Sequence, residues 1–184
     1  MTGQDALLIV DVQNDFCPGG FLPIPDGDAV APILSRWIAE GGLIVASRDW
    51  HPRNHSSFKE QGGPWPPHCI QNTPGAEFHR DLQLPKDALI ISKGTHVEFD
   101  QYSALDRTGL AEELRQRGIE RVWIGGVALD VCVRATVLDA LAQGFKAHLI
   151  LDATRAINVK AGDDQRAVSE MQAAGAMIVR GQTG

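Results

Sequence analysis

Three side chains that lie far apart in the sequence could together attack a carbonyl carbon: Asp11, Lys93 and Cys132. A thiol attacks a carbonyl only as a thiolate, so it needs a base to take its proton and a cation to stabilise the charge. The Asp11 carboxylate can serve as the base and the Lys93 ammonium as the cation. In the alternative interpretation Cys132 is a small buried hydrophobic residue, because cysteine is among the most buried residue types.

A second group of side chains has the chemistry of a metal site. Asp49 and His51 are alternate residues of one segment, and His68 follows further along the chain. One carboxylate and two imidazoles suit a divalent transition metal and leave coordination positions open for water or substrate. We expect zinc, with iron and manganese as alternatives that the same ligands accept. His55 is either a fourth ligand or a loop histidine that hydrogen-bonds the backbone.

Three aromatic residues, Phe16, Trp65 and Tyr102, lie in segments without helical or strand periodicity. Their flat faces suit a planar ring as substrate, although they could instead close these loops over the core. The other two cysteines, Cys17 and Cys69, have no matched base in the sequence, and we interpret both as structural.

The composition limits the class of protein. The 184 residues are enough for a sizeable core, and we expect a single domain over 1–184. A net charge of −6 without basic runs argues against nucleic acid as a partner. The apolar runs are too short to cross a membrane, and no signal peptide is recognisable. Three widely spaced cysteines do not form a disulfide framework, so we expect a reducing cytoplasm; the oligomeric state stays open.

The elements that must position these side chains follow from the hydrophobic pattern. Short apolar runs predict strands, and three- and four-residue apolar spacings predict helices between them. The strands are expected over 6–10, 43–46, 88–91, 122–126, 147–151 and 177–179, the helices over 28–40, 109–117, 131–143 and 163–174, and a loose tail over 180–184. Their alternation predicts a three-layer α/β/α sandwich with a mostly parallel, doubly wound central sheet.

The candidate residues fall at one edge of this sheet. Ligands of doubly wound sheets bind beyond the carboxyl ends of the strands. The first predicted strand leads to Asp11, the second to Asp49 and His51, and the third to Lys93. Four neighbouring strand ends, counting the one before Cys132, therefore carry reactive groups, which favours a catalytic site.

The turn after the fourth strand is rich in glycine and precedes a helical pattern. We expect Cys132 in the first turn of that helix, with Asp130 as its N-cap. Unpaired amides and the positive end of the helix dipole lie there, and both favour a thiolate.

Five segments carry a resemblance to a known family. They read DVQNDFCPGG over 11–20, DWHPRNHSSF over 49–58, WPPHC over 65–69, KGT over 93–95 and GGVALDVCV over 125–133. Together they resemble the isochorismatase-like cysteine hydrolase family, and within it the nicotinamidase/pyrazinamidase enzymes. The Lys-Gly and Gly-Val-Ala-x-x-x-Cys elements are typical of the superfamily, whereas the D-x-H and W-P-x-H-C elements are more specific.

The resemblance implies roles for individual residues. The implied catalytic triad is Asp11, Lys93 and Cys132, and the implied metal ligands are Asp49, His51 and His68. A cis peptide between Val127 and Ala128 is also implied, with an oxyanion hole formed by the amides of Ala128 and Cys132.

The activity that the resemblance implies is hydrolysis of nicotinamide to nicotinate and ammonia through a cysteine thioester, as in NAD salvage, with pyrazinamide as a second substrate. One alternative is another cysteine amidohydrolase of the superfamily, acting on a ureido or small aliphatic amide. A different class is a redox sensor or binding protein that uses Cys132 without turnover. The chain departs from the family pattern at His96, commonly acidic or an amide, and at Asn72, commonly glycine. Asparagine tolerates left-handed geometry, so we expect the turn at Asn72 to be kept.

Overall fold

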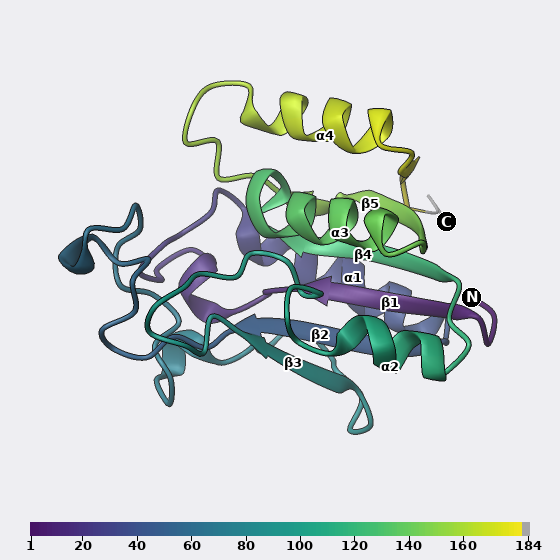
Figure 1. Cartoon of the computed structure of the whole chain (residues 1–184), viewed down its shortest axis with the longest axis horizontal. Helices are drawn as coiled ribbons and strands as arrows, with labels where there is room; N and C mark the ends of the chain where they lie inside the picture. The colour runs from purple at the N-terminus through teal and green to yellow at the C-terminus, as the bar shows by residue number, and fades with distance from the viewer. Residues whose placement is uncertain (182–184) are drawn as a thin grey trace.

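The computed structural model describes residues 1–181, so residues 182–184 of the expected tail lie outside the described residues. Within this range six strands form one sheet in the order β3-β2-β1-β4-β5-β6, and each adjacent pair is parallel (Figure 1). The strands are β1 (Asp5–Val10), β2 (Leu43–Asp49), β3 (Leu89–Lys93), β4 (Arg121–Val127), β5 (Lys146–Arg155) and β6 (Met177–Val179). The predicted parallel sheet is confirmed, and β2 and β5 run further than their apolar cores suggested.

Helices cover both faces of the sheet and complete the predicted three-layer sandwich (Figure 1). They are α1 (Val30–Ala39), α2 (Leu110–Gln116), α3 (Arg134–Ala142) and α4 (Asp163–Ala173). The first helix packs on one face through Leu34 and its neighbours. The other three cover the opposite face, with Leu114, Val137 and Met171 in the shared core.

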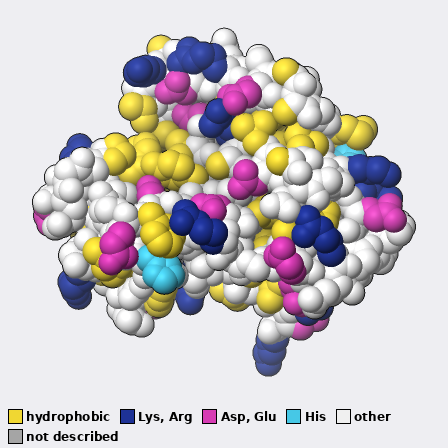
Figure 2. All heavy atoms as spheres, in the orientation of Figure 1, with side chains coloured by type: hydrophobic (Ala, Val, Ile, Leu, Met, Phe, Trp, Pro, Cys, Tyr) yellow, Lys and Arg dark blue, Asp and Glu magenta, His cyan; other side chains and the backbone are white. Residues whose placement is uncertain are grey.

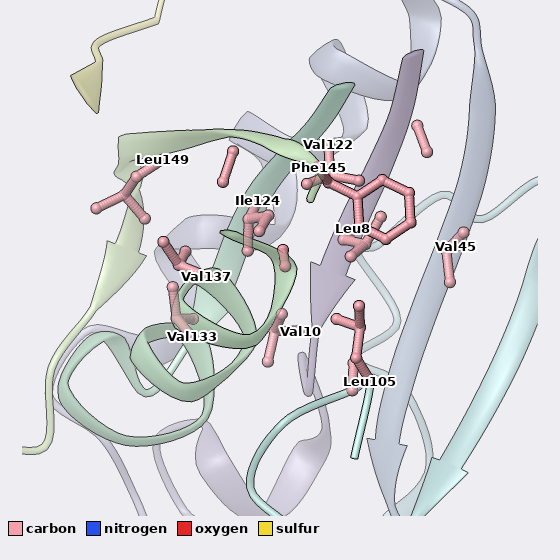
Figure 3. Close-up of a cluster of buried hydrophobic side chains, with 14 of the residues drawn as sticks. Leu8, Val10, Val45, Leu105, Val122, Ile124, Val133, Val137, Phe145 and Leu149 are labelled. Carbon is pink, nitrogen blue, oxygen red and sulfur yellow. The ribbon is translucent and has the colours of Figure 1, made fainter. Parts of the chain in front are cut away.

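The apolar residues of strand β1 explain why it lies in the middle of the sheet. All six of its residues are buried, because both faces of the sheet are covered. Leu7 belongs to the core on the α1 side, whereas Leu8 and Val10 belong to the core under α2, α3 and α4. Figure 3 shows Leu8 and Val10 among the aliphatic side chains of β4 and α3. Each buried leucine contributes about 1.5–3 kcal/mol to the free energy of folding.

The carboxyl ends of β1, β2, β3 and β4 meet at one edge of the sheet. The order of winding reverses at β1, which lies between β2 and β4. The long connection from β2 to β3 contains only two short 3-10 turns, Lys59–Gln61 and Pro74–Ala76. Isolated bridges join His51 to Ile70 and Phe58 to Trp65, so this connection folds on itself beside the strand ends.

The segment after β4 differs from the prediction of one continuous helix over 131–143. Residues Leu129–Val133 form a π-helical turn, and α3 begins only at Arg134. The amide of Val133 donates to the Ala128 carbonyl, which closes the wider i to i+5 ring. The N-cap prediction for Asp130 is wrong, because its carboxylate accepts hydrogen bonds from the amides of Ile157 and Asn158 instead.

Two further features concern the described end of the chain and the surface, where charged and apolar side chains are interspersed over the face seen in Figure 2. The Gly181 amide donates to Asp152 at 2.8 Å, so the described part of the expected tail is bound to β5. Within residues 1–181, no helix has both the length and the apolar character needed to cross a bilayer.

Candidate active site

The structure brings Asp11, Lys93 and Cys132 together at the carboxyl edge of the sheet. The Lys93 ammonium lies 2.8 Å from Asp11 Oδ2 and 3.4 Å from Cys132 Sγ. All three side chains are buried. Asp11 and Lys93 follow or end strands β1 and β3, and Cys132 lies in the π-helical turn after β4. The topology of the sheet thus brings together residues that are far apart in sequence.

The two oxygens of the Asp11 carboxylate have different partners. Asp11 follows β1 with a φ of 53°, and Ser47 donates to its Oδ1 at 2.8 Å. Oδ2 is buried and, among the described residues, accepts no hydrogen bond of good geometry, although it forms the ion pair with Lys93. Acidic oxygens of Asp11 and Asp49 and the Cys132 sulfur all lie within 4.8 Å of one another. The Asp11 carboxylate is therefore close enough to the sulfur to be a candidate for taking the thiol proton.

Burial sets the protonation of the site before any reaction. Burial raises the pKa of the Cys132 thiol well above its usual value, and the nearby Lys93 ammonium opposes this shift only in part. Desolvation therefore opposes the thiolate that the free amides and the dipole at this turn favour. Burial likewise raises the pKa of Asp11, against the attraction of Lys93. The thiol keeps its proton until a base removes it.

Asp49, His51 and His68 form a second buried cluster directly beside the triad. Asp49 Oδ2 lies 3.6 Å from His51 Nε2 and 3.8 Å from His68 Nε2. The other ring nitrogens face backbone carbonyls: His51 Nδ1 is 3.0 Å from the Gly94 oxygen, and His68 Nδ1 is 2.8 Å from the Pro66 oxygen. Such carbonyls orient metal-binding imidazoles and leave Nε2 as the ligand atom.

The donor set therefore fits a divalent transition metal. Gly94 supports the fit, because a Cβ at this position would collide with the His51 ring. The second carboxylate oxygen of Asp49, Oδ1, lies 2.5 Å from Lys93 Nζ, so Asp49 links the metal cluster to the triad.

His55 has the contacts of a loop histidine. Its Nδ1 is 2.7 Å from Ser57 Oγ and its Nε2 is 3.2 Å from the Phe99 carbonyl, so both ring nitrogens have partners. Its ring centroid lies 4.2 Å from that of His51. A second group of donor atoms, from His51, His55 and Asp100, is also close enough to share an ion. Its two hydrogen bonds favour a supporting role for His55.

One pocket opens above the sulfur and contains the three predicted aromatic residues. Phe16, Trp65 and Tyr102 line it together with Cys132, and the Trp65 indole donates to the Tyr102 hydroxyl at 3.1 Å. Ala128 also lines this pocket, and the peptide between Val127 and Ala128 is cis, as the resemblance implied. The remaining lining residues are Leu22, Ile24, Asp49, His51, His68, Asp100, Val131 and Ile157.

Sequence reasoning missed two buried polar residues that hold the cluster in place. Gln13 Nε2 donates to the carbonyls of Asp49 and Ala76, and Gln13 Oε1 accepts the Asp49 amide at 2.7 Å. Asp15 accepts the Cys69 amide at 2.7 Å, next to His68 in the chain. The polar run Gln13-Asn14-Asp15, close behind Asp11 at the strand end, was a signal that could have found both.

The remaining details agree with a structural role for the other two cysteines. Cys17, Cys69 and Cys132 are all buried free thiols. Burial raises the pKa of Cys17 to about 11 and that of Cys69 well above its usual value.

Asn72 has a φ of 61°, so the turn adopts the left-handed geometry expected at a position where the family commonly has glycine.

Comparison with known proteins identifies the family of this chain. The model of the isochorismatase domain matches residues 5–183. The chain belongs to the isochorismatase family. Among curated members of that family, it is 39% identical to the nicotinamidase of Escherichia coli K12 over 94% of this chain and 93% of the relative.

Two solved structures extend the comparison. The pyrazinamidase of Pyrococcus horikoshii in complex with zinc has a TM-score of 0.92 and 52% identity, covering 97% of this chain and 99% of that one. PnC1 of L. infantum in complex with nicotinate has a TM-score of 0.90 and 37% identity, covering 98% and 94%. The match spans nearly the whole chain in both cases.

Proposed function

We propose that this chain is a nicotinamidase that hydrolyses nicotinamide to nicotinate and ammonia, and that it also accepts pyrazinamide. The observation that carries the proposal is the Cys132 sulfur, paired with Asp11 and Lys93, at the base of an aromatic pocket beside a metal-type cluster. The zinc-bound pyrazinamidase and the nicotinate-bound relative support the same chemistry. The product would enter NAD salvage.

In the first half-reaction Asp11 Oδ2 takes the Cys132 proton as the sulfur attacks the carboxamide carbon. A C–S bond forms, and the carbonyl oxygen gains negative charge. The amides of Ala128 and Cys132, both from pocket-lining residues, stabilise this oxyanion. Asp11 then returns the proton to the nitrogen, the C–N bond breaks, and ammonia leaves.

In the second half-reaction Asp11 takes a proton from water, which attacks the thioester carbon, and the C–S bond breaks to release nicotinic acid, which loses its remaining proton to solvent and leaves as nicotinate. The returning proton restores the Cys132 thiol. Burial lowers the Lys93 pKa, but the carboxylates of Asp11 and Asp49 outweigh it and hold the pKa well above its usual value. Lys93 therefore stays cationic throughout and balances the buried negative charge.

Asp49, His51 and His68 would hold the metal, which we propose to be zinc. When bound, it supplies open coordination positions and a Lewis-acidic partner for a pyridine nitrogen. Phe16, Trp65 and Tyr102 bind the flat ring between them.

We also propose one domain over 1–184, supported by a single sheet that contains all strands from β1 to β6. The proposed location is a reducing cytoplasm, supported by three free thiols.

The test is ammonia release from a set of ring amides by the zinc-loaded protein. Nicotinamide and pyrazinamide, with a ring nitrogen meta to the carboxamide-bearing carbon, should be hydrolysed well. Benzamide lacks this nitrogen and picolinamide has it in the ortho position, so both should be poor substrates. Equal turnover of benzamide and nicotinamide would reduce the proposal to a general amidohydrolase, and turnover restricted to ureido or aliphatic amides would replace it.

A further inference from the structure

Asp130 lies two residues before Cys132, but its carboxylate is bound to a different segment. Oδ1 accepts a hydrogen bond from the amide of Ile157 at 3.0 Å, and Oδ2 accepts one from the amide of Asn158 at 2.8 Å. Both oxygens thus bind consecutive amides of the segment 156–162, which follows β5. Hydrogen bonds to an ionised acceptor are roughly twice as strong as neutral ones.

The segment 156–162 supplies one wall of the active-site pocket. Ile157 lines that pocket together with Val131 and Cys132. The segment forms neither helix nor strand and has no backbone ladder, so side-chain contacts contribute to fixing its position. Asn158 provides a second attachment, since its Oδ1 accepts the Asp164 amide in the first turn of α4 at 3.0 Å.

The turn that carries the nucleophile is held by other contacts. The amides of Val131 and Val133 both donate to the Ala128 carbonyl. These bonds do not involve the Asp130 side chain. Removing that side chain therefore takes two hydrogen bonds from the Ile157 wall, which keeps its packing on the core, and leaves the backbone around Cys132 in place.

We propose that Asp130 is a positioning residue that fixes the Ile157 wall relative to Cys132 and so sets how tightly the pocket binds the substrate ring. The identity of that ring rests on the proposed function. Because Asp130 acts through Ile157 and not on the reacting atoms, its loss weakens binding more than chemistry. KM rises while kcat stays near that of the wild type.

The kinetic test compares Asp130→Ala, Ile157→Ala and the double variant on nicotinamide. Each single change should raise KM on the order of 10-fold, the scale of losing one apolar contact in a pocket. The double variant should match the larger single effect, because both changes remove the same interaction. The control is Glu170→Gln, which weakens the ion pair of Glu170 with Arg134 between α3 and α4 without touching 156–162. Its KM should not change.

Amide hydrogen exchange tests the same link without substrate. In Asp130→Ala the amides of Ile157 and Asn158 should exchange faster than in the wild type, and in Glu170→Gln they should not. If Asp130→Ala does not fold, Asp130→Asn replaces it, since one amide then faces a side-chain N–H instead of an oxygen.

Several results would overturn the proposal. These are unchanged exchange at both amides, an additive double variant, or a loss confined to kcat. A wild-type protein that does not hydrolyse nicotinamide would overturn the proposed function, and the exchange measurement would still decide the role of Asp130.

Discussion

Lys93 is a fully buried ammonium between the carboxylates of Asp11 and Asp49, and this arrangement assigns the roles in the triad. With its pKa held high by the two carboxylates against the effect of burial, Lys93 cannot act as the base. Asp49 is occupied by Lys93 and two imidazoles. Asp11 shares Lys93, but no histidine of the described residues forms an ion pair with it, so we propose its carboxylate as the group that accepts and returns the proton.

The first prediction concerns this base. Asp11→Asn keeps the size of the side chain and its contact with Ser47 but removes the proton acceptor. We expect kcat to fall by at least about 10²-fold, the usual scale for a positioned acid–base group. Asp87→Asn, an exposed change before β3, is the control and should keep wild-type activity. A near-normal kcat for Asp11→Asn would leave Asp11 with a structural role only.

The second prediction concerns the nucleophile. Cys132→Ala should abolish ammonia release while circular dichroism shows an intact fold, because it removes the attacking sulfur. Cys17→Ala tests thiol loss elsewhere and should keep much of the activity. Mass spectrometry of quenched wild type should show a nicotinoyl adduct on Cys132. Substantial hydrolysis by Cys132→Ala, or an adduct on another residue, would exclude the covalent mechanism.

At the residue scale, the reactive side chains were easier to predict than the residues that hold them and the pocket in place. Asp11, Lys93 and Cys132 were found because reactive side chains at strand ends are unusual and topology brings such ends together. Ile157 was missed because an aliphatic residue in a loop has no distinctive pattern. Asp130 was misplaced as a helix cap, since its true partners lie 27 and 28 residues away in sequence.

At the element scale, Asp5 joins the first strand to the fourth at the edge opposite the active site. Its carboxylate accepts hydrogen bonds from Arg121 Nε at 2.6 Å and from Trp123 Nε1 at 3.1 Å, both on β4. The Thr2 hydroxyl donates to it as well, at 2.8 Å. Asp5 is buried, so these donors replace the water molecules that would hydrogen-bond an exposed carboxylate.

The third prediction follows from this network. Asp5→Ala leaves the donors of Arg121 and Trp123 without their acceptor and should lower the free energy of unfolding by about 1–3 kcal/mol in urea denaturation at pH 7. Asp87→Ala, an exposed aspartate outside the sheet, should change it by less than about 0.5 kcal/mol. Equal effects of the two changes would show that the network does not stabilise the sheet.

The pH dependence of the same variant has a definite sign. The hydrogen bond from Arg121 is the main cause that holds the pKa of Asp5 below its usual value of 3.8. A depressed folded-state pKa contributes stability above the unfolded-state pKa and loses it as the pH falls through the folded one. The stability difference between wild type and Asp5→Ala should therefore be full above about pH 5 and shrink as the pH falls below about 4.

The existence and order of elements were largely predictable, but their ends were not. β1 is an uninterrupted apolar run, so its place in the middle of a covered parallel sheet follows from composition. β5 continues through Asp152 to Arg155, because pairing of Thr154 and Arg155 with the end of β4 adds polar residues to the ladder. The π-helical turn at Leu129–Val133 is defined by the carbonyl to which each amide donates. The spacing of residues in the sequence does not reveal this choice of acceptor.

At the scale of the whole molecule, the long connection between β2 and β3 is the part with the least regular structure. It holds only two 3-10 turns, yet it supplies His51 and His68, which converge on Asp49 at the end of β2. A metal bound there would fasten this connection to the sheet. Because the ligand atoms assemble only in the folded protein, binding free energy adds to folding free energy.

The fourth prediction is that zinc raises the melting temperature and a chelator lowers it. Free metal at 100 times its dissociation constant should stabilise the native state by about 2.7 kcal/mol. Calorimetry of zinc-loaded and chelator-treated protein measures this, with metal content determined alongside. His68→Ala should lose both the bound zinc and the shift in melting temperature. His79→Ala changes a histidine of the same connection that lies outside the cluster, so it should keep both. A metal-independent melting temperature in the wild type, or an equal loss in His79→Ala, would show that Asp49, His51 and His68 do not hold the metal that stabilises this fold.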